Sequence, residues 1–202
     1  MTDQPPRPRF WTLANAFTFA RFALAPVCAW FYLQQTYWGV WVAGWAGGLA
    51  MFTDFCDGYF ARRQKQVSDL GKIFDPLADA MFFIIVWTAL GVAGAFPLWL
   101  TIPFIGRETL QHVYLRPTAA RFGLVLAANV WGKLKTLLQT LTLIAVSWVE
   151  FLIHYWPDIE GWGRWLNIAL VGLTALVSVL SMLPYLTAVA RLRRAATPAV
   201  QP

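Results

Sequence analysis

Six long apolar segments constrain this chain more than any other feature of its sequence. They cover residues 15–33, 37–55, 76–96, 98–115, 134–155 and 168–190. Each is close to the roughly 20 residues that a helix needs to cross a hydrocarbon core about 30 Å thick. Lipid cannot satisfy exposed backbone groups, and no alternating strand pattern is visible, so the spans are expected to be helices. The segments therefore predict an all-α, polytopic membrane protein with six transmembrane helices.

The composition agrees with this prediction. Of the 202 residues, 58% are hydrophobic and only 13% are charged, whereas a soluble domain has about 25% charged residues. We expect a flexible cytoplasmic N-terminus over residues 1–10, a membrane domain over 11–194 and a flexible tail over 195–202. No cleavable signal peptide is expected, because no small-residue cleavage site follows the first apolar segment.

The basic residues lie in alternate connections between the apolar segments. They precede the first segment, separate the second from the third and the fourth from the fifth, and follow the sixth: Arg7, Arg9, Arg62, Arg63, Lys65, Lys72, Arg116, Arg121, Lys133, Lys135, Arg191, Arg193 and Arg194. The other connections contain a single basic residue, Arg164. The positive-inside rule therefore predicts that both termini are cytoplasmic. Although the net charge is +6, the cations form no single stripe, and no nucleic-acid partner is expected.

Tryptophans lie near many of the predicted segment ends and loops. We expect them to form an interfacial aromatic belt, with these members: Trp87, Trp99, Trp131, Trp148, Trp156, Trp162 and Trp165.

Four aspartates carry the chemistry of the sequence. Asp54 and Asp57 are three residues apart, and Asp75 and Asp79 are four apart, so each pair projects from one helix face. We place the first pair at the cytoplasmic end of the second helix. The second pair is expected at the start of the third helix, with Pro76 at the first helical position. Ionised groups at membrane depth are costly and usually mark a functional site.

Carboxylates crowded at the mouth of two helices repel each other unless cations lie between them. Oxygen ligands of this kind suit Mg²⁺ or Mn²⁺, and two such ions form the clamp used in phosphoryl transfer. Gly58 and Gly71 allow close backbone approach to a ligand, and Arg62 can bind phosphate with two prongs. The alternative is a solvated loop in which the aspartates only pair with neighbouring basic residues. The sequence favours a site for two divalent cations and a phosphate-linked substrate.

These positions follow the pattern D-x2-D-G-x2-A-R-x8-G-x3-D-x3-D. It resembles the signature of the CDP-alcohol phosphatidyltransferase family, and it is matched at Asp54, Asp57, Gly58, Ala61, Arg62, Gly71, Asp75 and Asp79. The resemblance implies six transmembrane helices, two divalent metal ions and a homodimer. It also implies an active site within the bilayer that faces the cytoplasm, so the expected location is a bacterial inner membrane.

The resemblance also implies roles for individual residues. Asp54 and Asp75 are expected to contact both metal ions, and Asp57 one of them. Asp79 is expected to contact the other ion and to act as the base that takes the proton of the acceptor hydroxyl. The expected contacts of the CDP group come from the signature and from an N-x2-T-x2-R segment near the N-terminus: Gly58, Ala61, Arg62, Ser68, Gly71, Asn15, Thr18 and Arg21.

Two further stretches concern the acceptor. Arg107-Glu108 and the segment from Gly132 to Gln139, which contains Lys133 and Lys135, resemble segments of the bacterial phosphatidylglycerophosphate synthases, one branch of the family. The implied donor is CDP-diacylglycerol and the implied acceptor is glycerol 3-phosphate. An acceptor that bears phosphate needs cations, and the expected ones are Arg107, Lys133, Lys135 and Arg116. Because Arg107 lies in an apolar segment, we expect it to face the interior and meet a partner, with Glu108 the nearest acid.

Alternatives remain open for the acceptor and for the class of protein. Ala80 stands where those synthases commonly have lysine, so inositol phosphate, serine and phosphatidylglycerol are alternative acceptors. A cation transporter would have acids scattered at mid-membrane depth, whereas five of the ten acidic residues here lie between positions 54 and 79. A membrane prenyltransferase also binds a diphosphate through metals, but a different aspartate spacing is expected there.

Overall fold

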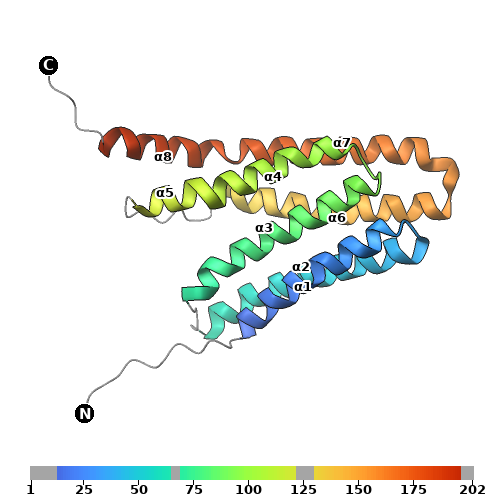
Figure 1. The fold of residues 1–202 in the computed structure, drawn as a ribbon, viewed down its shortest axis with the longest axis horizontal. Helices are drawn as coiled ribbons and strands as arrows, with labels where there is room; N and C mark the ends of the chain where they lie inside the picture. Colours follow the sequence, from blue (N-terminus) through green and yellow to red (C-terminus); the bar gives the residue numbers. More distant parts are fainter. Residues whose placement is uncertain (1–12, 65–68, 122–129, 197–202) are drawn as a thin grey trace, which may run out of the picture. The chain divides into compact units, whose positions relative to one another are not determined.

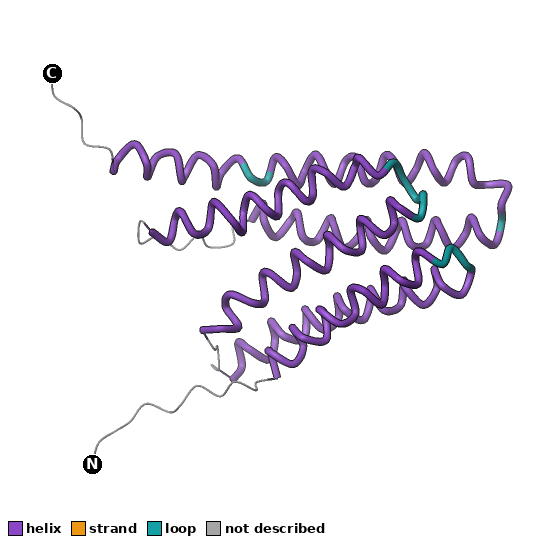
Figure 2. The backbone as a smooth tube through the Cα atoms, viewed as in Figure 1, coloured by secondary structure: helices purple, strands orange, loops and turns teal. Residues whose placement is uncertain are grey.

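The computed structural model describes the backbone of residues 13–64, 69–121 and 130–196, and the side chains of residues 19–50, 77–121 and 130–191. Within these ranges all regular structure is helical and no strand occurs (Figures 1 and 2). The all-α prediction is confirmed. The chain divides into two compact units, Met1–Ala89 and Leu90–Pro202, and each is described by itself.

Three long helices build the first unit. They are α1 (Leu13–Leu33), α2 (Tyr37–Gln64) and α3 (Asp69–Val92), the last of which belongs to this unit up to Ala89. Helices α1 and α2 run in opposite directions and pack along their length (Figure 1). Their buried side chains include several small ones, Ala25, Cys28, Ala43 and Ala50. Small residues at an interface let two helix backbones approach closely, as is common between membrane helices.

The turn between α1 and α2 is determined by local polar contacts. The Thr36 hydroxyl oxygen accepts the backbone N–H of Gly39 at 3.1 Å, the usual bond between an N-cap side chain and the third helical residue. Gln35 has a φ of 48°, the left-handed conformation that lets the chain reverse within three residues. The cap therefore fixes where α2 begins.

Apolar side chains, some of them large and aromatic, fill the buried face of α3. Phe82, Val86 and Trp87 each have 0% of their surface exposed. The expectation that Trp87 belongs to the aromatic belt is wrong, because its ring is packed inside the protein. The other six tryptophans of that prediction are exposed: Trp99, Trp131, Trp148, Trp156, Trp162 and Trp165.

The second unit contains the remaining helices. In chain order they are η1 (Leu98–Thr101), α4 (Ile102–Thr109), η2 (Leu110–Leu115), α5 (Arg116–Arg121), α6 (Val130–Tyr155), η3 (Pro157–Ile159), α7 (Glu160–Leu180) and α8 (Leu183–Ala196). The stretch from η1 to α5 is helical without interruption, and η2 is a π-helical turn within it. Helix α6 runs opposite to α7, and α8 continues the direction of α7 (Figure 1).

Close contacts hold α6 against α7. A Cβ atom at Gly163 would lie 2.9 Å from Ile153 Cδ1 and 3.1 Å from Val149 Cγ1, so a side chain there would push the helices apart. Further along, the hydroxyls of Thr142 and Thr174 lie 2.7 Å apart and are buried. This hydrogen bond joins the two helices inside the unit.

The predicted segments follow the order of the described helices, but the sixth segment corresponds to two helices, α7 and α8, and several of the predicted ends are wrong. Helix α2 continues to Gln64 and α3 begins at Asp69, although the apolar segments stop at residue 55 and resume at 76. Pro76 therefore lies inside α3, not at its first position. Hydropathy marks where apolar residues end, whereas a helix can continue into polar sequence.

Two described helical stretches are long and apolar enough to cross a membrane, judged by length and composition. They are Val130–Tyr155 and Pro157–Arg191, and shorter apolar helices cover Phe19–Leu33 and Leu77–Val92.

Candidate active site

Asp79 is the one predicted metal ligand whose side chain is described, and it has a cationic partner. Arg21 on α1 donates from Nη1 to Asp79 Oδ1 on α3. Arg21 is 1% exposed, whereas the carboxylate of Asp79 is about one-third exposed, at 38%. The pair ties the predicted CDP-binding arginine to the predicted base within the first unit.

The other signature positions lie on the described backbone of α2 and α3. Asp54 and Asp57 are in the second half of α2, and Asp75 is in the first third of α3. Their side chains lie outside the described part of the structure. The same holds for the side chains predicted to bind CDP other than Arg21: Asn15, Thr18, Gly58, Ala61, Arg62, Ser68 and Gly71. Their roles stay predictions.

A buried charge cluster centred on Glu108 joins α4 to α6 in the second unit. Arg107 Nη1 lies 3.0 Å from each carboxylate oxygen of Glu108, and Lys135 Nζ donates to Oε1 of the same group. The three residues are 5%, 3% and 5% exposed, in the order Arg107, Glu108, Lys135. Buried charges are stable only when they are paired and hydrogen-bonded, and one carboxylate here serves two cations. The expectation that Arg107 faces the interior and meets Glu108 is confirmed.

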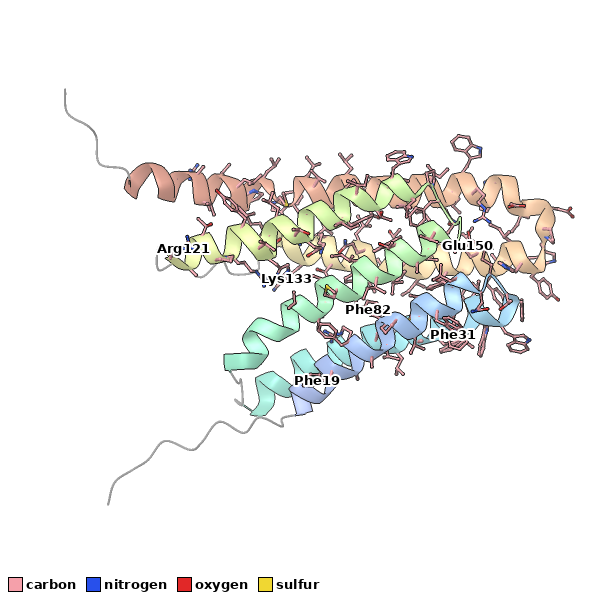
Figure 3. The ribbon with its side chains drawn as sticks, viewed as in Figure 1. Phe19, Phe31, Phe82, Arg121, Lys133 and Glu150 are labelled. Atoms are coloured by element: carbon pink, nitrogen blue, oxygen red, sulfur yellow. The ribbon has the colours of Figure 1, made fainter. Side chains whose placement is uncertain are left out.

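The remaining basic residues of the predicted acceptor site are placed differently. Lys133 is exposed and lies near the start of α6 (Figure 3). It is two residues from Lys135, which puts it on a different side of the helix. Arg116 is half-buried at the first position of α5. His112 Nε2 also approaches the cluster and lies 3.5 Å from Glu108 Oε2.

Polar atoms around the Glu108 cluster are buried and, within the described residues, have no hydrogen-bond partner. They are Arg107 Nε, Gln111 Oε1 and both polar atoms of the Gln139 carboxamide. Gln111 is 5% exposed and Gln139 is 0% exposed. Because an unpartnered buried polar group is unfavourable, each one needs a physical reason. No role was predicted for either glutamine, although a polar amide in an apolar segment is itself a sign of a functional site.

A second polar cluster lies at the other end of α6 (Figure 3, label Glu150). Glu150 Oε1 accepts hydrogen bonds from Arg164 Nη1 and Asn167 Nδ2, both at 2.8 Å. The same Asn167 amide donates to the Ala95 carbonyl at 3.3 Å. These bonds connect α6, α7 and the turn before η1. Glu150 Oε1 and Asn167 Nδ2 thus bond only to protein groups here, although Asn167 Oδ1 has no partner within the described residues. We interpret the cluster as a structural bracket between these elements.

The two sites differ in what they can do chemically. Asp79 offers a partly accessible oxygen base beside a fixed arginine. The Glu108 cluster carries two cations and one anion, which leaves a net positive charge in an apolar setting when the imidazole of His112 is neutral. Such a group suits a phosphate, because charge-assisted hydrogen bonds to phosphate are strong where water is excluded.

Comparison with known proteins decides the family. The model of the CDP-alcohol phosphatidyltransferase family matches residues 11–180, which is most of the chain. The chain belongs to this family. The resemblance read from the aspartate signature is confirmed, and the protein is an enzyme, a CDP-alcohol phosphatidyltransferase of phospholipid biosynthesis.

Two relatives of this phosphatidyltransferase are similar to it over most of their length, and a third over half of its length. A Bacillus subtilis (strain 168) protein named CDP-diacylglycerol–glycerol-3-phosphate 3-phosphatidyltransferase is 36% identical over 159 residues, which are 73% of this chain and 79% of the relative. The Escherichia coli (strain K12) protein of the same name is 32% identical over 163 residues, 78% of this chain and 83% of the relative. A Streptomyces coelicolor protein named cardiolipin synthase (CMP-forming) is 34% identical over 108 residues, 52% of this chain and 50% of that protein.

Proposed function

We propose that this enzyme transfers the phosphatidyl group of CDP-diacylglycerol to glycerol 3-phosphate, with phosphatidylglycerol phosphate and CMP as products. The observation that carries the choice of acceptor is the buried pair of cations, Arg107 and Lys135, held by Glu108. An acceptor with its own phosphate uses two converging cations, whereas an uncharged acceptor such as serine does not. The names of the Bacillus subtilis and Escherichia coli relatives specify the same two substrates.

The reaction forms one phosphate ester bond and breaks the phosphoanhydride bond of the donor's diphosphate. The primary hydroxyl oxygen of the acceptor attacks the phosphorus that carries diacylglycerol, and the bond from that phosphorus to the CMP oxygen breaks. Asp79 accepts the hydroxyl proton, and Arg21 holds its carboxylate in place. A positioned general base typically contributes about 10²–10⁴ in rate. Arg107 and Lys135 bind the acceptor phosphate and orient its hydroxyl.

The carboxylates of the signature fit a pair of hard divalent cations. Four aspartate side chains, Asp54, Asp57, Asp75 and Asp79, supply oxygen ligands only, the donor set of Mg²⁺ or Mn²⁺. Asp79, the described member, already balances a positive charge, that of Arg21. When bound, two such ions neutralise the diphosphate of the donor and orient it for in-line attack. Residues of the signature and of α1 hold the CDP group: Gly58, Ala61, Arg62, Ser68, Gly71, Asn15, Thr18 and Arg21.

The setting of the site is also part of the proposal. Six transmembrane helices over a single domain of residues 11–194 place both termini and the active site on the cytoplasmic side. The expected location is a bacterial inner membrane, with lipids around the helices and a homodimer as the assembly. Two apolar stretches of sufficient length, Val130–Tyr155 and Pro157–Arg191, and the alternating charge of the connections support this arrangement.

Phosphatidylglycerol is the second candidate acceptor, because one relative is named cardiolipin synthase. Its phosphate is a diester with one negative charge, whereas the phosphate monoester of glycerol 3-phosphate carries up to two. Two cations that share one carboxylate favour the more highly charged monoester.

An acceptor panel tests the proposal. Purified full-length enzyme in detergent is supplied with CDP-diacylglycerol, Mg²⁺ and one labelled acceptor: glycerol 3-phosphate, phosphatidylglycerol, inositol phosphate or serine. CMP release and labelled lipid are measured together. We expect both with glycerol 3-phosphate. Release with only one of the other alcohols would show that the acceptor is assigned wrongly while the transferase chemistry stands.

A further inference from the structure

Gln139 is the most completely buried polar side chain near the Glu108 cluster. It is 0% exposed, and neither its amide nitrogen nor its oxygen has a hydrogen-bond partner among the residues that the structure describes. Most buried amides in proteins have partners, because leaving a donor and an acceptor unpaired is unfavourable. A ligand that both donates and accepts hydrogen bonds would satisfy this group.

The position of Gln139 links it to the cations. It lies four residues after Lys135 on α6, so the two side chains share one face of the helix, about one turn apart. Lys135 in turn reaches Glu108, which holds Arg107. A small molecule whose phosphate binds the two cations therefore needs to be about as long as one helical turn to reach the Gln139 amide.

A second buried and unpartnered group lies at the same level on α7. Ser178 is 0% exposed, and within the described residues its hydroxyl has no partner. The Thr142–Thr174 hydrogen bond shows which residues of α6 and α7 lie opposite each other. Gln139 is three residues before Thr142 and Ser178 is four residues after Thr174, so in two antiparallel helices both are one turn from that bond in the same direction.

The combination of these groups defines a ligand class. Two cations match a phosphate, and an amide with a hydroxyl matches an alcohol, which donates one hydrogen bond and accepts others. We propose that Gln139, together with Ser178, binds the secondary hydroxyl of a three-carbon alcohol phosphate and so selects glycerol 3-phosphate among phosphorylated alcohols. This inference rests on the proposed function. It makes Gln139 a residue that determines acceptor specificity.

A buried water molecule is the competing occupant. Water fills polar sites that offer two or more partners, and Gln139 would then contribute only to packing. The two occupants differ in one measurable property, because only a substrate-binding amide changes how the enzyme ranks two acceptors.

The test compares two acceptors that differ in that hydroxyl. The kcat/KM values of the full-length enzyme in detergent, with CDP-diacylglycerol and Mg²⁺, are measured for sn-glycerol 3-phosphate and for 3-hydroxypropyl phosphate, which lacks it. A site built to bind a hydroxyl rejects the analogue without it, and we expect a preference of roughly 10–100-fold in the wild type. Gln139→Met should reduce this preference to about 1–3-fold by lowering kcat/KM for glycerol 3-phosphate.

Thr142→Val is the matched control. It removes a buried polar group one turn further along α6 whose partner, Thr174, is within the protein, so the preference should stay at the wild-type value even if the protein becomes less stable. If Gln139→Met does not fold, Ser178→Ala replaces it, and we expect a preference lowered roughly 3–10-fold.

The outcomes distinguish a failure of the specificity role of Gln139 from a failure of the proposed function. An unchanged preference in the Gln139 or Ser178 variant of an enzyme that uses glycerol 3-phosphate would overturn the specificity role and favour a buried water. Absence of a preference in the wild type would do the same. A wild-type enzyme that transfers to another alcohol and never to glycerol 3-phosphate would instead overturn the proposed function, and this inference with it.

Discussion

Glu108 shows what a single side chain contributes to the enzyme. Its carboxylate accepts hydrogen bonds from Arg107 and Lys135, which come from two different helices, and it lies 3.5 Å from His112. Without it, two cations would be buried side by side in an apolar setting, which is strongly unfavourable. The carboxylate balances the charge of both cations and holds them close together, and a phosphate can then bind between or beside them.

The first prediction separates the two lysines of α6. Lys135→Met should raise the KM for glycerol 3-phosphate roughly 10–100-fold, because a charge-assisted hydrogen bond contributes about 1.5–3 kcal/mol. Lys133→Met is the matched control. Lys133 is exposed, so its loss should change KM less than about threefold, as expected for a screened surface charge. Steady-state kinetics of CMP release measures both, and a larger effect at Lys133 would show that the acceptor binds elsewhere.

The sequence alone predicted the chemistry at this scale but not the choice between residues. The expected cations of the acceptor site included Arg107, Lys133 and Lys135, and Glu108 was the acid expected to meet Arg107. Which lysine turns inward depends on the rotation of α6, and charge patterns alone cannot supply that. Ser178 gave no signal, since serines are common in apolar helices and its significance comes from the register with α6.

At the scale of the helix, the bracket at Glu150 holds three elements together. Asn167 on α7 donates to Glu150 on α6 and to the Ala95 carbonyl before η1. Just before Ala95, Gly94 ends α3 with a φ of 85°, and bonds from Gly94 N to Gly91 O and from Ala95 N to Leu90 O close the helix in a Schellman motif. The turn therefore presents the Ala95 carbonyl to Asn167.

The second prediction concerns this bracket. Asn167→Leu removes a fully buried amide. The Ala95 carbonyl then loses this donor, and Glu150 Oε1 keeps the hydrogen bond from Arg164, so we expect a loss of about 1–3 kcal/mol in stability. Thermal unfolding in detergent should show a lower midpoint, while the ratio of kcat/KM between acceptors stays unchanged.

Glu160→Gln is the control for that variant. It removes only the long contact of 3.5 Å to Arg164, where Glu160 is 59% exposed, and exposed pairs of this kind contribute little. If Asn167→Leu unfolds at the same temperature as the wild type and as this control, the bracket does not stabilise the second unit.

Helix ends were the least predictable part of the fold. The six apolar segments overlap described helices in the right order, and the break between α7 and α8 within the sixth was not predicted. The apolar pattern does not predict that α2 continues to Gln64 or that α3 begins at Asp69. The residues there are polar and basic, and such residues are also typical of a connection. The π-helical turn over Leu110–Leu115 had no counterpart in the apolar pattern, since hydropathy does not report an extra residue in one turn.

At the scale of the whole molecule, the distribution of positive charge makes a prediction about topology. Six spans would put both termini on one side of the membrane, and the positive-inside rule predicts that this side is the cytoplasm. Green fluorescent protein fused to either end should fluoresce. Alkaline phosphatase, which is active only outside the cytoplasm, should be active when it is inserted between α6 and α7, after Trp156. Measuring both reporters in bacterial cells gives the orientation of three points of the chain. Termini on opposite sides of the membrane would contradict the six-span arrangement.

The whole account depends on divalent cations held by the signature carboxylates, and one assay tests this directly. CMP release from CDP-diacylglycerol and glycerol 3-phosphate is followed in purified wild-type enzyme and in Asp75→Asn, first with excess chelator and then as Mg²⁺ is restored. We expect chelation to abolish turnover and Mg²⁺ to restore it in the wild type. The turnover rate of Asp75→Asn should fall by at least the roughly 10²–10⁴-fold typical of a catalytic group. Undiminished turnover in Asp75→Asn, or full activity in chelator, would contradict the metal-dependent chemistry.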